Sequence, residues 1–257
     1  MHTTKVLDHG FVTLRNIAGP TRRTLQNYDI SQPEDIECDF DAEDVDPANA
    51  ARMSFNQMDG ETITDADGTV RPRVRADDLK LCKFLMKNWH TSPFEMIECW
   101  IEMKLPIFVA RQFVRHRTVS INEVSGRYVT LPAEWYIPEV VGAKPDKAKQ
   151  GQVDTLSATQ QAGFNCFLNA HCENGYAHYS DAIQMGVAPE HARLFLSLNH
   201  YTHWLWKQDL HNMMHFLSLR DHSHAQIEAQ AYAKAIDAHI RRVLPNCMAL
   251  YDEYRKR

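Results

Sequence analysis

Hydrophobic and polar residues alternate most regularly over Ile97–Leu105, where every second residue is apolar. A period of two is typical of a strand with one covered face. Gly10–Ile17 is rich in β-forming residues and ends at a Gly19-Pro20 turn signal, so a second strand is expected there. His200–Lys207, which is rich in aromatic residues, is predicted to be extended, and Arg127–Thr130 to form a short strand.

Other segments repeat their apolar residues every three to four positions, as one face of a helix requires. The clearest is Asp77–Trp89, whose apolar face carries Leu79, Leu81, Phe84 and Leu85. Further helices are predicted over residues 48–55 behind an N-cap at Asp46-Pro47, over Ile107–Val114 behind Pro106, over Leu156–Met185, from Pro189, from an N-cap at Asp209 through Leu219, and over Ser223–Val243 before Pro245.

The connections and the order of these elements decide the fold class. Residues 56–73 are polar with Asp-Gly turn signals, which predicts a surface loop or short hairpin, and residues 144–152 read as a second polar loop. The order is mixed and lacks a regular βαβ alternation. We therefore expect one α+β domain over residues 1–257, with a mainly antiparallel sheet flanked by long helices. The sequence has no Gly-rich phosphate loop, so a bound nucleotide must be held in another way.

Composition narrows the function classes. The 257 residues carry a net charge of −5, so the molecule as a whole does not favour nucleic acid, and any anion site must be a local cluster of bases. No apolar run approaches the length of a membrane span, and the first ten residues do not resemble a signal peptide, which predicts a cytoplasmic protein without a membrane partner. The six cysteines, none in a CxxC pair, are expected to be reduced and mostly buried: Cys38, Cys82, Cys99, Cys166, Cys172 and Cys247.

Residues 111–128 form the most informative segment, with four arginines, one histidine and Glu123 as the only acid. Arg111 and Arg115 lie one helical turn apart, and the apolar residues before them would bury the opposite side of the helix. Such a helix would aim its guanidinium groups inward or into a cleft, where anions must offset their charge. Arginine suits planar, two-pronged contacts to phosphate, and Ser125-Gly126 can bring a hydroxyl and bare backbone N–H groups close to one. The alternative is a solvated basic face or a structural salt-bridge network.

Four blocks in this region resemble the flavin-dependent thymidylate synthases. Arg115-His116-Arg117 followed after seven residues by Ser125 matches the family's RHR-x7-S signature. His90-Thr-Ser-Pro-Phe-Glu95, Pro106–Gln112 and Leu219–Gln226 are similar to three further segments, in the family's order, so the resemblance covers roughly residues 85–235. It implies a reductive methylation of dUMP in which methylenetetrahydrofolate supplies the carbon and NADPH reduces FAD. Asn246-Cys247-Met248 does not resemble the Pro-Cys-His nucleophile of the classical enzyme, which fits a route without a protein nucleophile.

The resemblance also implies ligand contacts. Arg220 matches the arginine thought to face the uracil ring, where a guanidinium stabilises negative charge and cannot act as a base. The positions that match dUMP contacts are Gln112, Phe113, Val114, Arg115, Glu123, Val124, Ser125, Gly126, Arg127, Arg193 and Arg220. Those that match FAD contacts are His90, Ser92, Arg115, His116, Arg117, Glu123, Asp209, Leu210, His211, His215 and His224. Part of the family has Asn-x-Arg and Asn where this chain has Asp209-Leu-His211 and His215. Family members form homotetramers with active sites at subunit interfaces, so self-association is expected.

Two other functions compete with this one. His211 and His215, with His222 and His224 beyond them, could hold a metal, but HExxH is absent and no carboxylate stands at a known ligand spacing. We therefore expect no metal. A nucleic-acid module would use the basic segment with Phe113, Tyr128 and Trp135, against the acidic net charge. Tyr201, Trp204 and Trp206 are interpreted as core or subunit interface.

Overall fold

The computed structural model describes residues 3–19, 42–55, 62–64, 66, 68, 70–72, 76–144 and 155–256. The strands are β1 (Thr3–Val6), β2 (Gly10–Ala18), β3 (Thr62–Thr64), β4 (Val70–Pro72), β5 (Glu98–Pro106), β6 (Ser120–Glu123) and β7 (Tyr201–Asp209). The helices are α1 (Asp46–Arg52), α2 (Ala76–Lys87), α3 (Ser92–Glu95), α4 (Ile107–Phe113), α5 (Ala158–Gln184), α6 (Pro189–Ala192), α7 (Leu210–Arg220), α8 (Ile227–Val243) and α9 (Pro245–Tyr254), with 3₁₀ turns η2 (Met53–Phe55) and η3 (Arg193–Phe195).

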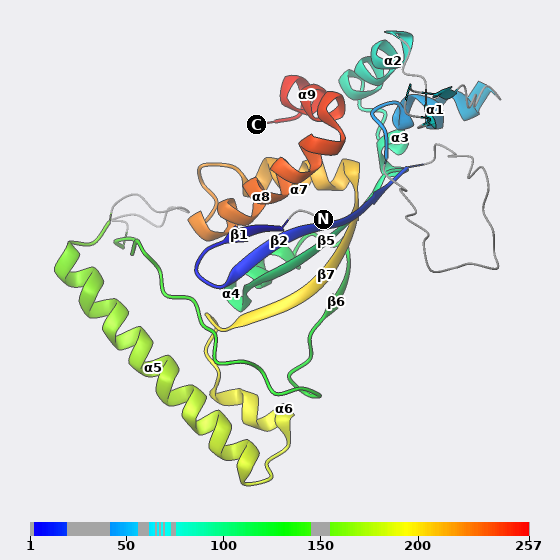
Figure 1. Ribbon diagram of the computed structural model, residues 1–257. Coiled ribbons are helices and arrows are strands. Elements are labelled where there is room, and N and C mark those ends of the chain that lie inside the picture. The colour runs from blue at the N-terminus through cyan, green and yellow to red at the C-terminus, as the bar shows by residue number, and fades with distance from the viewer. Residues whose placement is uncertain are drawn as a thin grey trace. The chain divides into compact units, whose positions relative to one another are not determined.

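Five strands form one antiparallel sheet in the order β1-β2-β5-β7-β6 (Figure 1). β5 has one covered face, as its period of two predicts: Cys99, Ile101 and Met103 are fully buried, and the residues between them are partly exposed. β3 and β4 form a separate hairpin, which confirms the hairpin alternative for part of 56–73. The predicted α+β class with a mainly antiparallel sheet and long helices is confirmed.

The chain divides into two compact units. Unit 1 consists of the described residues of Met1–Thr13, Ile101–Trp206 and Leu219–Ile236, and unit 2 of those of Leu14–Trp100, Lys207–Ser218 and Asp237–Arg257. The expectation of a single domain over the whole chain stays a prediction. None of the described helices is long and apolar enough to cross a bilayer.

The core of unit 1 is aromatic. Phe113 stacks on Trp206 at 6.0 Å between ring centroids and meets the edge of Tyr232 at 6.4 Å. The Tyr232 hydroxyl donates to the Lys104 carbonyl at 2.7 Å, which satisfies its one buried polar group. Tyr201, Trp204 and Trp206 are all buried, so the interpretation of this cluster as core is confirmed.

Also within unit 1, α5 packs against α6 and η3 (Figure 1). Ser157 and Gln160 form a reciprocal capping box at its N-terminus, which explains why the helix begins at Ala158. Only Cys172, Tyr179 and Ala182 are buried among its 27 residues, so most of this helix is exposed in a single chain.

In unit 2, one carboxylate joins two distant segments. Asp44 accepts the backbone N–H groups of Cys247 at 2.7 Å and Asn246 at 3.1 Å, so it supplies acceptors to the first turn of α9. The first N–H groups of a helix have no partner within the helix, and negative charge is favourable there. Pro245 ends α8 as predicted, but it also begins α9, which the sequence analysis missed.

Other predictions were wrong in detail. Asp46 is the first residue of α1 and not its N-cap, which is Val45, because the Asp46 carboxylate turns back to accept the Glu43 N–H at 2.8 Å. Arg127–Thr130 is not a strand, because the N–H groups of Tyr128 and Val129 bond back to the Ser125 carbonyl and close a turn. Strands β1 and β6 were not predicted. Pro20, Cys38 and residues 56–61, 65, 67, 69, 73 and 145–152 lie outside the described residues.

Candidate active site

Arg220, the last residue of α7, has an unusual set of partners in unit 1. Its Nε donates to Nε2 of His116 at 3.0 Å, and its Nη2 donates to the Gln112 carbonyl at 3.0 Å. Both acceptors are neutral, and no ion pair with a carboxylate joins Arg220 to the described residues. The side chain is half-buried, and burial lowers its pKa from the ordinary arginine value. Arginine nevertheless stays protonated in proteins, so the charge remains available to a ligand.

The C-terminal end of α4 explains how this guanidinium is held. Val109, Ala110 and Phe113 bury the apolar face of the helix, which leaves Gln112, on another face, partly exposed. The last carbonyls of a helix have no partner within the helix and carry partial negative charge. The Gln112 carbonyl is one of them, and it accepts from Arg220.

Gln226 is a neighbour that the sequence analysis did not list among the site residues. Its Oε1 accepts from Nε2 of Gln112 at 2.6 Å, which links the segment before α8 to the end of α4. The signal was present, because Gln226 closes the Leu219–Gln226 block. Two contacts from this block, one from Arg220 and one from Gln226, therefore meet on the single residue Gln112.

The expected phosphate-binding segment forms a compact turn after β6. Ser125 Oγ accepts the Arg127 N–H at 3.3 Å, while the Val124 N–H donates to the His203 carbonyl at 2.8 Å. Thr202 donates its hydroxyl to the Glu123 carboxylate. Gly126 is buried, and a Cβ there would lie 3.5 Å from Cδ of Arg193 and 3.0 Å from Cδ1 of Leu131.

This close approach brings Arg193 beside the turn from a segment about 70 positions away. Arg127 pairs with Glu190 on α6 at 3.6 Å, and both side chains are about half exposed. Arg115, Arg117, Arg127 and Arg193 are all exposed in the single chain. Of the two expected directions for this cluster, inward is therefore wrong within one chain, because the core of unit 1 takes the apolar face of α4 and leaves the charges outside. The alternative, that the cluster points into a cleft, stays a prediction.

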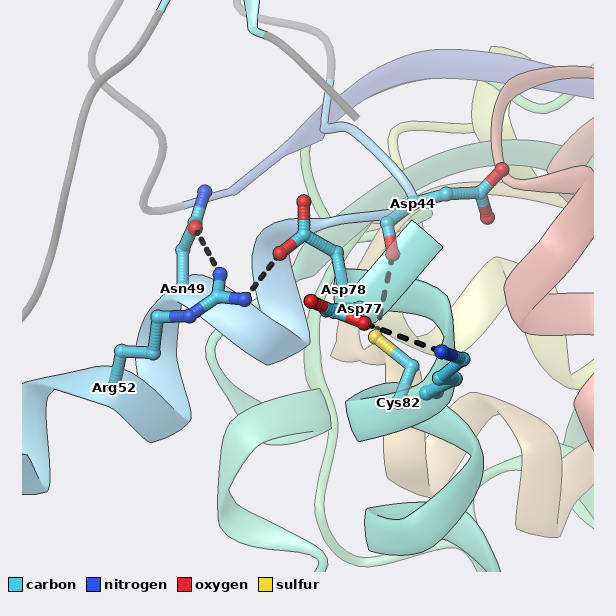
Figure 2. Close-up of polar contacts among 7 residues, drawn as sticks. Asp44, Asn49, Arg52, Asp77, Asp78 and Cys82 are labelled. Atoms are coloured by element: carbon cyan, nitrogen blue, oxygen red, sulfur yellow. Dashed lines mark hydrogen bonds and ion pairs between the residues drawn. The ribbon is translucent and has the colours of Figure 1, made fainter. Parts of the chain in front are cut away.

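Unit 2 contributes a pocket of about 450 Å³ lined by α1, η2, α2 and α3, to which His90 and Ser92 both belong. The His90 ring stacks on Phe84 with centroids 5.8 Å apart. Arg52 also lines the pocket; Asn49 accepts from its guanidinium at 3.2 Å, and Asp78, which is buried, pairs with it (Figure 2). The sequence analysis did not single out Arg52.

Asp209 acts as the N-cap of α7, as predicted. Its carboxylate accepts the Asn212 backbone N–H at 2.9 Å and the Asn212 side-chain amide at 2.7 Å. Leu210 is fully buried and its N–H donates to the Ile97 carbonyl, so in the single chain neither its side chain nor its N–H is open to a cofactor. His211 and His215 line a second pocket in unit 2, of about 90 Å³.

Comparisons with known proteins decide the family. A family model described as thymidylate synthase complementing protein matches residues 39–246. A flavin-dependent thymidylate synthase of Ehrlichia ruminantium is 36% identical over 252 residues, which cover 97% of this chain and 73% of that protein. One from Thermus thermophilus is also 36% identical, over 98% of this chain and 79% of the relative.

The chain belongs to the flavin-dependent thymidylate synthase family.

The fold agrees with this membership. The solved structure of PolB, a UMP/dUMP methylase from Streptomyces cacaoi bound to 5-Br UMP, superposes with a TM-score of 0.75 at 22% identity, over 98% of this chain and 97% of PolB. The predictions of family, of an FAD-dependent enzyme and of thymidylate synthesis are confirmed by the family match and the relatives.

For a flavin-dependent thymidylate synthase, each unit by itself has groups that suit part of a dinucleotide cofactor. Basic groups and small polar side chains are available for phosphates, and apolar pockets in unit 2 carry His90, Ser92, His211 and His215. Of the remaining predicted flavin contacts, Asp209 and Leu210 also belong to unit 2, and Arg115, His116, Arg117, Glu123 and His224 belong to unit 1. The predicted ligand contacts stay predictions, residue by residue.

Among the described residues, no three His, Cys, Asp or Glu side chains gather in a way that could hold a metal ion. Phe113, one of the aromatic residues that a nucleic-acid module would use, is buried and cannot stack on a base.

Proposed function

We propose that this protein methylates dUMP to dTMP, with methylenetetrahydrofolate as the carbon donor and NADPH-reduced FAD as the hydride source. The observation that carries the proposal is the environment of Arg220. It is a half-buried guanidinium that two neutral acceptors orient and that no described carboxylate neutralises. A preorganised positive charge of this kind is suited to negative charge that develops on a ligand during reaction.

Arg220 is assigned to the uracil ring. Its guanidinium cannot remove a proton at neutral pH, but it can stabilise negative charge that spreads over N3 and O4 of the pyrimidine. His116 and the Gln112 carbonyl fix its orientation and leave its net charge intact. Half burial strengthens the interaction, because electrostatic attraction grows as water is excluded.

The dUMP phosphate is assigned to the turn after β6. Ser125 supplies a hydroxyl, Gly126 lets the turn pack closely against Arg193, and Arg127 and Arg193 supply positive charge. Arg127 already pairs with the exposed Glu190, but an exposed pair of this kind is weak, so a phosphate can compete for the guanidinium.

Three of the five described cysteines support a route without a protein nucleophile. Burial raises the pKa of the Cys82 thiol to about 12 and that of the Cys247 thiol well above its ordinary value. Burial likewise raises the pKa of Cys99. A thiolate is the reactive form, so these three side chains are poor nucleophiles at neutral pH.

The enzyme is further proposed to act in the cytoplasm as a homotetramer whose active sites lie at subunit interfaces. The exposed basic groups of unit 1 support this, because in a single chain they have little around them to enclose a ligand. Large apolar side chains exposed on and after α5 support it too, with Phe167, Met185 and Leu194 each more than three-quarters exposed. Sedimentation of the purified protein tests the assembly, and a stable monomer would contradict it.

The decisive experiment combines product analysis with an Arg220 series. Purified protein supplied with dUMP, methylenetetrahydrofolate, NADPH and FAD is expected to form dTMP, detected by chromatography. Arg220→Ala is expected to retain flavin, seen as yellow colour, while turnover falls about 10²–10³-fold. Arg242→Ala, which removes an exposed arginine from α8, serves as the matched control. Absence of dTMP with all substrates present, or wild-type turnover in Arg220→Ala, would overturn the proposal.

A further inference from the structure

The second pocket of unit 2 holds a basic residue that the family resemblance did not assign. Arg255, just past the end of α9, lines it together with His211, His215 and Trp89. Its volume of about 90 Å³ corresponds to about three water molecules. The space is too small for a nucleotide ring system, but it suits one small anionic group.

Arg255 is poorly satisfied by the protein itself. Its guanidinium carbon lies 3.2 Å from the centroid of the Trp89 ring, so the planar group stacks on the indole. Its Nε and Nη1 atoms are buried and have no hydrogen-bond partner among the described residues. Burial also lowers its pKa from the ordinary value. A buried donor without an acceptor is costly, and two on one charged group point to a missing ligand.

Met86, Phe94 and Met214 make part of the lining apolar, while its other polar residues agree with an anion. His211 and His215 are four residues apart on α7, so both rings lie on the side that faces the pocket. Ser218 continues the same face with a hydroxyl, although that hydroxyl already donates to the His215 carbonyl. No acidic residue lines the pocket among the described residues. The carboxylates that act on His211 are Glu95 and Asp209, of which Asp209 is engaged in capping α7.

We propose that this pocket binds a phosphoryl group of the nucleotide cofactor, and that Arg255 donates most of the charge and hydrogen bonds. This rests on the proposed function, since it takes FAD as the source of the phosphoryl group. A guanidinium presents two parallel N–H donors that match phosphate oxygens, and Trp89 holds its plane in place before the ligand arrives. Arg255 is thus a cofactor-positioning residue supplied by the C-terminal end of the chain.

The test measures binding by calorimetry to the full-length protein freed of flavin. Titrants are FAD, ADP, inorganic phosphate and riboflavin, which lacks phosphate. Loss of charged hydrogen bonds in Arg255→Met is expected to weaken FAD and ADP binding roughly 10- to 100-fold and to leave riboflavin unchanged. Arg255→Lys keeps the positive charge but loses the two parallel N–H donors, so its affinity for FAD and ADP is expected to lie between those of wild type and Arg255→Met. Arg242→Met, which alters an exposed arginine in the same unit, should match wild type.

Equal weakening of riboflavin and FAD in Arg255→Met would indicate a purely structural role and overturn the inference, as would unchanged affinity for FAD and ADP. Binding of inorganic phosphate that depends on Arg255, without an effect on FAD, would place a free anion there and overturn the assignment to the cofactor. Because no titration requires turnover, Arg255-dependent FAD binding in a protein that makes no dTMP would leave this inference standing while the proposed function fails. Thermal unfolding of each variant confirms that it folds.

Discussion

The Nε of Arg220 donates to Nε2 of His116 at 3.0 Å, across 104 positions of sequence. Since Nε2 is the acceptor, the ring must be neutral and carry its proton on Nδ1. His116 thereby orients a guanidinium and does not compete with its charge. The same guanidinium reaches the Gln112 carbonyl at the end of α4, so the end of α7 and the end of α4 are fixed to each other inside unit 1.

The role of His116 can be separated from that of a simple ligand contact. In His116→Ala, Arg220 loses one of its two anchors, and kcat is expected to fall about 10- to 100-fold because small misplacements of a catalytic group are costly. His116→Gln restores an acceptor oxygen and should recover part of the loss. Steady-state kinetics with dUMP and flavin content measure both. Equal loss in Ala and Gln variants would indicate that the hydrogen bond to Arg220 is not what matters.

Gly126→Ala tests the turn after β6. The new Cβ would lie 3.0 Å from Cδ1 of Leu131 and 3.5 Å from Cδ of Arg193, so the turn must shift. We expect a higher KM for dUMP with a smaller change in kcat, because the proposed phosphate contacts lie in this turn and the proposed ring contact is Arg220. Gly163→Ala on α5 is the control, since its Cβ meets nothing within 4 Å, and helix propensity predicts a gain of about 0.5–1 kcal/mol. A KM equal to wild type in Gly126→Ala would contradict the assignment.

Asp209→Ala should lower stability by about 0.5–2 kcal/mol, because α7 loses the acceptor for the Asn212 N–H. Asp209→Asn keeps an oxygen in place and is expected to unfold near wild type. Urea denaturation of both variants provides the comparison. If Asp209→Asn lowers the free energy of unfolding as much as Asp209→Ala does, Asp209 stabilises α7 through its charge and not through its capping hydrogen bond.

His200 predicts a pH dependence of stability. Burial lowers its pKa below the ordinary value of 6.5, despite an opposing effect of Glu134. Its Nε2 atom is buried and has no hydrogen-bond partner among the described residues. The unfolded chain therefore binds a proton more readily below about pH 6.5, so the stability falls as the pH drops through that window, by at most about 1.4 kcal/mol per pH unit.

Replacement of His200 by Gln removes the titrating group and should flatten this slope. The measurement is the free energy of unfolding at several pH values on both sides of the histidine pKa, compared between variant and wild type. His211 also has a pKa lowered by burial, so His211→Gln should remove a separate part of the slope. A slope unchanged by His200→Gln would show that the buried ring is not responsible.

Local patterns determined much of this protein. The alternation in β5, the apolar face of α2 and the prolines at α1 and α6 act through neighbours a few residues away, so the sequence is enough to place these elements. The four motif blocks likewise identify the family from the sequence alone. Where the pattern misled, at Arg127–Thr130, the β-forming side chains were overridden by the Ser125 carbonyl, which accepts their N–H groups.

Only the tertiary structure decided which distant groups meet. No local period brings Arg220 to His116, Gln226 to Gln112 or Arg255 to Trp89, because these contacts depend on the path of the chain over more than a hundred positions. The tertiary structure also decided which side chains are exposed. Leu210 and Phe113 are buried, whereas Arg115 and Arg117 are exposed. Folding removes apolar surface from water, but the sequence alone does not say which side of each helix or strand will be covered.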